Sequence, residues 1–183
     1  MPETTAIMQK ESYPYRYPRV PIQRRIYAFL LDFVVVWLIS ALVGIPIFQF
    51  IAFLAAWWGL RVYAVRRYQG QSLGRWAFDV EIIDGKRAKL PRMEVLTKRE
   101  LTLGAIALLG VIGLQYGLPN VLTAIILTAP LFVNLIIAVG DEENQQGVHD
   151  RLFDTVIVPS RRGYSLDIRI RRWVDQISDR MRQ

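Results

Sequence analysis

Two long apolar runs dominate the hydrophobic pattern of the chain. Residues 26–60 carry one charged side chain, Asp32, and residues 101–140 carry none. A helix needs about 20 residues to cross the hydrocarbon core, so each run predicts two spans. Turns predicted at residues 44–46 and 115–120, which contain Gly and Pro, divide the runs. The predicted spans cover residues 26–43, 47–65, 101–114 and 121–139.

The basic residues determine the predicted orientation. All 23 Lys and Arg residues lie in the segments 1–25, 61–100 and 141–183, and the two hairpin turns hold none. The positive-inside rule therefore places both termini and the central segment in the cytoplasm. This pattern predicts an all-α, multi-pass membrane protein with four transmembrane helices in two hairpins. The formal net charge of +7 comes from basic residues in the segments that this orientation places in the cytoplasm. We therefore expect the lipid bilayer as the partner of the chain, and not nucleic acid.

The segments outside the spans predict smaller elements. Residues 1–25 form a polar N-terminal segment. In the cytoplasmic loop 66–100, residues 78–83 alternate like a strand and are followed by Asp84-Gly85, a hairpin turn signal. A return strand over 86–90 and a third strand over 155–158 are expected, giving a small cytoplasmic β-hairpin or sheet. The tail 160–183 predicts a basic amphipathic helix, which would bind anionic lipids at the cytoplasmic face or pack on a protein partner.

Asp32 is the one ionisable side chain well inside a predicted span, where an unpaired charge is costly. Helical side chains lean toward the helix N-terminus, so Arg25 leans away from Asp32, whereas Arg61 on the antiparallel second span leans toward it. We therefore predict an Asp32–Arg61 contact, with Arg99 less well placed and Asn134 of the fourth span nearby. The pair is either a proton or cation site or a buried pair that fixes helix register.

Gly70, Ser72 and Gly74 match G-x-S-x-G, the pattern of the serine-hydrolase nucleophile elbow, and the one histidine, His149, lies downstream. An elbow serine lies between a strand and a helix of an open α/β sheet, but here a membrane helix precedes it and a strand follows. We therefore expect no catalytic residues and no enzyme. The glycines are interpreted as a joint after the second span, with Ser72 capping the connecting turn. His149 is interpreted as a loop hydrogen-bonding residue, or as a cytoplasmic pH sensor.

Three segments of the chain carry recognisable motifs: Arg25-x-x-Ala28-x-x-x-Asp32; Gly70-Gln71-Ser72-Leu73-Gly74, followed by strand 80–83 and Asp84-Gly85; and Gly147-Val148-His149-Asp150-Arg151, followed by Thr155-Val156. Together they resemble the RDD family of bacterial membrane proteins. The family is named for one arginine and two aspartates, which correspond here to Arg25, Asp32 and Asp150. The resemblance covers roughly residues 19–159. Ser72 stands where the family has Thr, and the short first turn and the basic tail depart from the family pattern.

The resemblance implies a bacterial membrane location and suggests transport, most concretely cation/proton exchange. A small transporter or cation/proton-coupling protein using Asp32 is the first functional hypothesis, with Arg61 or Arg25 setting the Asp32 charge state. A non-catalytic accessory or assembly subunit of a larger membrane complex is the alternative. The first hypothesis requires a homo-oligomer, since four spans make a thin solute path. The chain has no cysteine, and no metal or other cofactor is expected.

Overall fold

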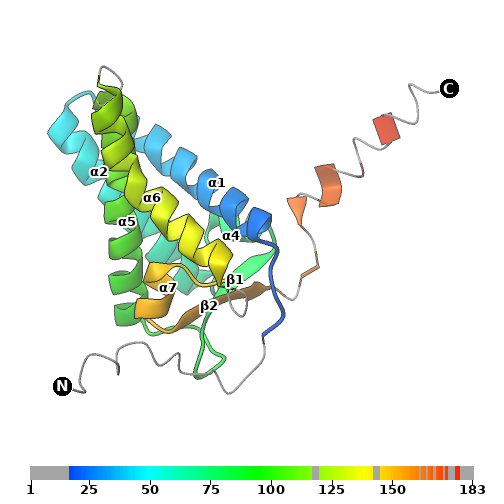
Figure 1. Ribbon diagram of the computed structural model, residues 1–183. Helices are drawn as coiled ribbons and strands as arrows, with labels where there is room; N and C mark the ends of the chain where they lie inside the picture. The colour runs from blue at the N-terminus through cyan, green and yellow to red at the C-terminus, as the bar shows by residue number, and fades with distance from the viewer. Residues whose placement is uncertain are drawn as a thin grey trace, which may run out of the picture.

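The computed structural model describes residues 17–116, 120–141 and 145–160, together with scattered residues between 162 and 177. The fold is mostly helical, with one small sheet (Figure 1). The long elements are α1 (Ile22–Ala41), α2 (Pro46–Trp58), α5 (Met93–Tyr116) and α6 (Val121–Gly140). The short elements are η2 (Gly59–Tyr63), α3 (Ala64–Arg67), α4 (Leu73–Ala77), β1 (Val80–Asp84), α7 (Val148–Leu152) and β2 (Thr155–Pro159).

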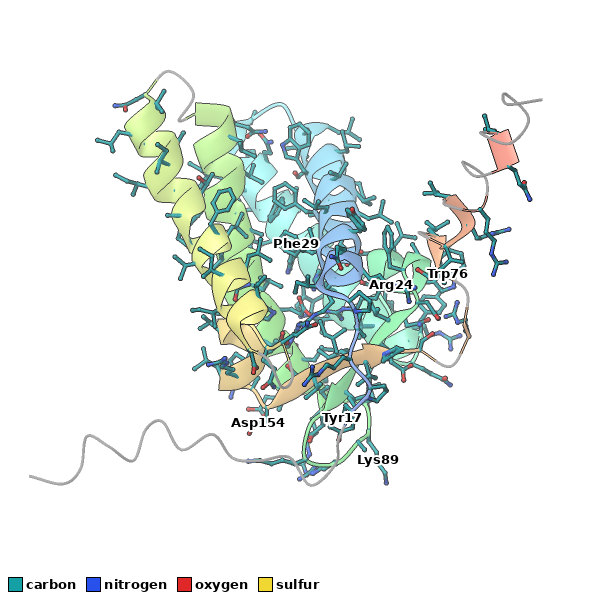
Figure 2. The ribbon with its side chains drawn as sticks, turned by 45° about the vertical axis from the view of Figure 1, so that its right-hand side comes forward. Tyr17, Arg24, Phe29, Trp76, Lys89 and Asp154 are labelled. Atoms are coloured by element: carbon teal, nitrogen blue, oxygen red, sulfur yellow. The ribbon has the colours of Figure 1, made fainter. Side chains whose placement is uncertain are left out.

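The long helices pack as two hairpins. α1 packs on α2, α2 on α5, and α5 on α6, while the short helices and the sheet gather at one end of this bundle (Figure 1). The first hairpin turns at the predicted residues, because Pro46 can begin a helix where no amide donor is needed. Tyr17, Lys89 and Asp154 mark the end of the molecule that carries the sheet (Figure 2).

Two helical stretches are long and apolar enough to cross a membrane, Pro46–Arg67 and Val121–Gly140. They correspond to the predicted second and fourth spans. α1 and α5 are not among these two stretches, and α5 begins at Met93, well before the predicted start of the third span. The predicted third span began after Glu100 because the prediction was based on the uncharged run 101–140. The structure instead includes Arg99 and Glu100 in the helix, where both side chains are buried.

The sheet differs from the predicted hairpin. β1 pairs antiparallel with β2, with Val80 opposite Pro159 and Asp84 opposite Thr155. The return strand expected over 86–90 is wrong, because the Asp84 carboxylate accepts the backbone N–H groups of Lys86 and Arg87 and closes a tight turn instead. The expected third strand therefore pairs directly with the first and joins the two halves of the chain.

The apolar core lies between α1, α2 and α5. Its fully buried members are Val36, Phe53, Trp57, Leu103, Ala107 and Val111. α6 is different, because Ala138 is its one buried residue among those described. Glycines of α5 allow α5 and α6 to pack closely: a Cβ at Gly110 of α5 would stand 2.5 Å from Leu131 Cδ1 of α6. Residues 1–16 and most of the tail 161–183 lie outside the described residues, so the amphipathic tail helix stays a prediction.

Candidate functional site

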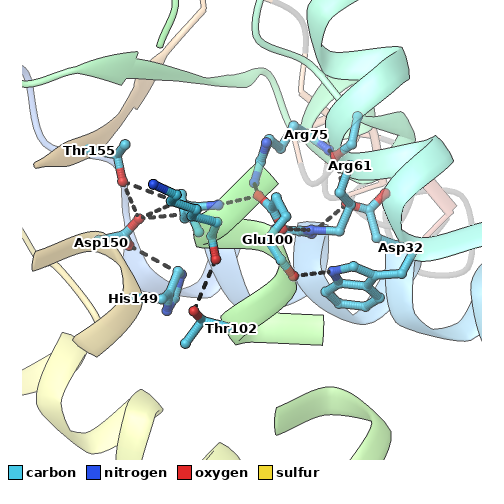
Figure 3. A network of polar contacts seen from close by, with 12 residues as sticks. Asp32, Arg61, Arg75, Glu100, Thr102, His149, Asp150 and Thr155 are labelled. Carbon is cyan, nitrogen blue, oxygen red and sulfur yellow. Dashed lines mark hydrogen bonds and ion pairs between the residues drawn. The ribbon is translucent and has the colours of Figure 1, made fainter. Parts of the chain in front are cut away.

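Seven charged side chains meet where the long helices reach the short elements (Figure 3). We call them the charged network, and six of them are almost fully buried, while the Arg25 side chain is 9% exposed. Four are arginines and three are carboxylates, so the network carries one excess positive charge. Its members are Arg25 and Asp32 from α1, Arg61 from η2, Arg75 from α4, Arg99 and Glu100 from α5, and Asp150 from α7.

The Asp32 carboxylate accepts three hydrogen bonds. Arg61 Nη1 lies 2.7 Å from Oδ2, which confirms the contact predicted from the helix directions. Ser72 Oγ donates to the same oxygen at 2.6 Å, and the Gly74 backbone N–H donates to Oδ1 at 2.7 Å. Asp32 is therefore covered by α4 and lies in a polar environment, although its sequence neighbours are apolar.

The segment 70–74 is the joint that the sequence predicts, and it also binds Asp32. Gly70 adopts a φ of +97°, where side chains are strained. Ser72 caps α4 by accepting the Arg75 N–H, while its hydroxyl donates to Asp32. A Cβ at Gly74 would stand 2.0 Å from the Ala28 carbonyl oxygen, so α4 can approach α1 only because this residue is glycine.

Glu100 is the centre of the arginine cluster. Its Oε2 accepts from Arg61 Nε at 2.7 Å, and its Oε1 accepts from Arg75 Nη2 at 2.7 Å and from Arg99. The Arg61 guanidinium also lies 4.9 Å from the ring centroid of Trp57, within cation–π range. One carboxylate thus compensates three guanidinium groups, which leaves the arginines in excess.

Arg75 holds the one buried side-chain nitrogen or oxygen without a hydrogen-bond partner among the described residues. This atom is Nη1, and the Arg75 side chain is 2% exposed. Burial and then the neighbouring Arg61 lower the pKa of Arg75 to about 10, which still leaves it charged at neutral pH. A buried charged donor without a partner is costly, so this nitrogen is a feature that requires an explanation.

Asp150 joins α7 to both hairpins. It pairs with Arg25 of α1 at 3.1 Å and with Arg99 of α5, and it accepts from the Thr155 hydroxyl at 3.0 Å. Burial alone would raise the pKa of this carboxyl, but the charges of Arg99, His149 and Arg25 together outweigh burial and hold the pKa well below its usual range. Arg25 therefore turns away from Asp32, as its direction along α1 predicts.

Asn134 and His149 form a separate contact beside the network. Asn134 Oδ1 accepts the Val148 N–H at 3.0 Å and lies 3.0 Å from His149 Nδ1, so the His149 ring donates from Nδ1. Within the described residues, the polar contacts of Asn134 are therefore with α7. No hydrogen bond joins Asn134 to Asp32 among the described residues, so the expectation that Asn134 lies near Asp32 stays a prediction.

Acidification is expected to destabilise the fold through His149. Burial lowers the pKa of His149 to about 4 from an ordinary value of 6.5, although the neighbouring Asp150 opposes that change. The unfolded chain therefore binds a proton first, and the free energy of unfolding falls by roughly 3 kcal/mol as pH drops from about 6.5 to 4. Thermal unfolding of the detergent-solubilised chain across this range measures the effect.

The matched variant for the pH experiment is His149→Gln, which keeps an amide donor and cannot titrate. Its unfolding temperature is expected to change less between pH 6.5 and pH 4 than that of the unmodified chain. Asp150 stays ionised over this range, because Arg99 holds its pKa lower still. An equal fall in both proteins would show that another group carries the pH dependence.

A cleft of about 320 Å³ opens between α1 and α6, with α5 behind it. Its walls are apolar, and Phe29 of α1 lies on the side facing the bundle (Figure 2). Leu30 and Phe132 line the cleft and are 46% and 61% exposed. From the charged network, five of the seven side chains line its charged end: Arg25, Arg61, Arg75, Arg99 and Asp150.

The sequence analysis identified four of the seven residues of the charged network. Asp32, Arg61, Arg25 and Asp150 were singled out, and the structure brings all four into one network. Glu100, Arg75 and Arg99 were not predicted as members, and Glu100 contradicts the expectation that Asp32 is the one acid inside the helices. The adjacent Arg99-Glu100 pair at the start of an apolar run was the available signal. Among the described residues, no group of three or more potential metal ligands occurs.

Comparison with protein families matches residues 19–154 of the chain to the RDD family. This match covers most of the chain and includes all seven residues of the charged network. The chain belongs to the RDD family, which is membrane-associated. Searches of curated proteins and of solved structures found no match.

Proposed function

We propose that this RDD-family protein is a four-span membrane transporter whose substrate path is the α1/α6 cleft, and that its substrate is an anion. The observation that carries the proposal is the charge lining the cleft: four arginines and one carboxylate, at the closed end of apolar walls. Low-dielectric walls strengthen the field of such charges and favour a ligand of opposite sign. The resulting site attracts anions and repels cations.

The bilayer placement rests on the exposed apolar side chains of all four long helices. Leu38 of α1 and Val121 of α6 are exposed, as are Ile47 of α2 and Leu114 of α5. Exposed apolar surface of this extent fits lipid and not water. The basic residues lie in segments 1–25, 61–100 and 141–183, and the two hairpin turns hold none. The end that carries the sheet therefore faces the cytoplasm under the positive-inside rule.

The arrangement of Asp32 favours an anion over the cation or proton route. Asp32 does not line the cleft, and its carboxylate is already occupied by Arg61, Ser72 and the Gly74 backbone. A cation or proton carrier needs a carboxylate that the solute can reach. In this arrangement Asp32 instead fixes α4 against α1 and holds Arg61 beside the cleft.

Electrical recording from proteoliposomes tests the sign of the transported solute. Concentration jumps of chloride and acetate are compared with jumps of sodium and potassium at constant pH. We expect currents with at least one anion, suppressed in Leu135→Trp, which fills the cleft. Leu122→Trp adds the same bulk to the exposed face of α6, outside the cleft, and should leave them unchanged. Currents carried by sodium, potassium or protons alone would support the Asp32 route instead.

The four-span topology has its own test, which the lack of cysteine in the chain makes simple. A cysteine at Gly44 should react with a membrane-impermeant maleimide added outside intact cells. A cysteine at Lys86 should react only after the membrane is opened. The reverse pattern, or equal labelling at both sites, would contradict the proposed orientation.

An accessory role in a larger membrane complex is the second candidate, and α6 favours it. This helix buries one described residue, and its exposed side chains include Ile125, Phe132 and Ile136. Such a face could pack on a second copy or on another membrane protein as well as on lipid. Gentle solubilisation followed by native mass spectrometry separates these cases: a single partner of fixed stoichiometry, together with electrically silent proteoliposomes, would favour the accessory role.

A further inference from the structure

The geometry of the cleft points to a specific ligand class: we propose that it binds a single-chain anionic amphiphile, a fatty-acid carboxylate, with the head at Arg75 and the chain along α1 and α6. This inference rests on the proposed function and narrows its substrate. The head, the chain and the route of entry are each supported by a separate feature of the cleft.

The head site is defined by the nitrogen that lacks a partner. Arg75 lines the cleft, its side chain is 2% exposed, and its Nη1 has no hydrogen-bond partner among the described residues. Its Nη2 is held by Glu100 at 2.7 Å, which fixes the guanidinium in place. A carboxylate oxygen on Nη1 would supply the missing acceptor with a charge-assisted hydrogen bond.

The charge balance of the network fits a monovalent head. Four arginines face three carboxylates, so one negative charge brings the buried group to neutrality. Asp141 is a further buried acid outside the network: it attracts Arg25 and also pairs at 3.6 Å with Arg151, whose side chain is 47% exposed. A carboxylate supplies that single charge, whereas a neutral alcohol supplies none and an amine would add to the excess.

The chain site is defined by the walls and the volume of the cleft. Beyond the arginines the lining is apolar, from Ile22 to Phe33 on α1 and through Leu131 and Leu135 on α6. The volume of about 320 Å³ lies at the lower end of the range for small-ligand pockets, about 300–1,000 Å³. It therefore suits one hydrocarbon chain.

The route of entry is the open side of the cleft. Leu30 and Phe132 line the cleft and remain exposed, one on each bordering helix. If these helices cross the bilayer, that opening faces the lipid chains. An amphiphile dissolved in the bilayer could then enter sideways, with its head moving toward the arginines.

Equilibrium binding of radiolabelled dodecanoate to the full chain in phosphatidylcholine nanodiscs tests the inference, with empty nanodiscs subtracted. We expect saturable binding, with dodecanol, dodecylamine and butyrate competing at least tenfold more weakly than unlabelled dodecanoate. Arg75→Gln should weaken binding at least tenfold. Leu135→Trp should do the same without touching the network, whereas Leu122→Trp should bind like the unmodified chain.

Each outcome decides the inference. Three results would overturn the inference: dodecanoate binding that does not saturate, dodecanol that competes as well as dodecanoate, or Leu135→Trp that binds dodecanoate fully. Arg75→Gln is interpreted only if its thermal unfolding remains cooperative, and otherwise Leu135→Trp and the competitor series carry the test. Chloride and acetate have no hydrocarbon chain to fill the cleft. Loss of dodecanoate binding with intact currents from those anions would therefore overturn the amphiphile inference and leave the proposed anion transport standing.

Discussion

Replacing Glu100 with glutamine is expected to lower the free energy of unfolding by about 3–5 kcal/mol, the range for breaking a buried ion pair. Glu100 is fully buried and compensates Arg61, Arg75 and Arg99 at once. The neutral amide would leave the four arginines of the network facing two carboxylates. Chemical unfolding of the purified chain in detergent, followed by tryptophan fluorescence, measures the loss.

The same helix provides a matched control for this substitution. Glu94 pairs with Lys98 at 2.6 Å, but its side chain is 74% exposed. Solvent screens such a pair, so Glu94→Gln should leave the unfolding midpoint almost unchanged. A similar loss of stability in Glu100→Gln and Glu94→Gln would mean that the charged network does not stabilise the fold. It would also contradict the claim that Glu100 holds Arg75 in place.

Gly74→Ala is the second substitution with a large expected effect. The added Cβ would stand 2.0 Å from the Ala28 carbonyl oxygen and 3.0 Å from Asp32 Oδ1, so α4 must move away from α1. That movement stretches the 2.7 Å hydrogen bond from the Gly74 N–H to Asp32. Overpacking and the loss of a charge-assisted bond together predict a destabilisation of about 3 kcal/mol or more.

Gly59→Ala is the control, because a Cβ at Gly59 meets nothing within 4 Å and its φ of −58° suits any residue. Alanine should stabilise this helical position by roughly 0.5–1 kcal/mol. The two substitutions therefore have opposite expected signs, and thermal unfolding of both variants compares them directly. A Gly74→Ala protein as stable as Gly59→Ala would contradict the close packing of α4 on α1.

The long helices and the Asp32–Arg61 contact could be predicted from the sequence because both depend on local rules. Uninterrupted apolar runs define the helices, and the lean of helical side chains toward the N-terminus defines which arginine reaches Asp32. The joint at residues 70–74 was predicted for a similar reason, since Gly and Ser have specific backbone preferences.

The rest of the site depends on contacts between segments far apart in the sequence. Arg25 meets Asp150, and β1 meets β2, only after both hairpins have packed, so spacing along the chain carries no sign of either contact. Glu100 was missed because a charged residue next to an apolar run normally marks its boundary. Here three arginines from η2, α4 and α5 make its burial possible.

The central claim is that the α1/α6 cleft is the substrate path, and a reversible cross-link across its opening tests it most directly. The chain has no cysteine, so Leu30→Cys with Phe132→Cys introduces the only two thiols, one on each bordering helix. A cleavable bis-thiosulfonate reagent would join them in proteoliposomes. We expect the anion current to fall on cross-linking and to return on reduction, while either single-cysteine variant keeps its current. An undiminished current in the cross-linked protein would contradict the account.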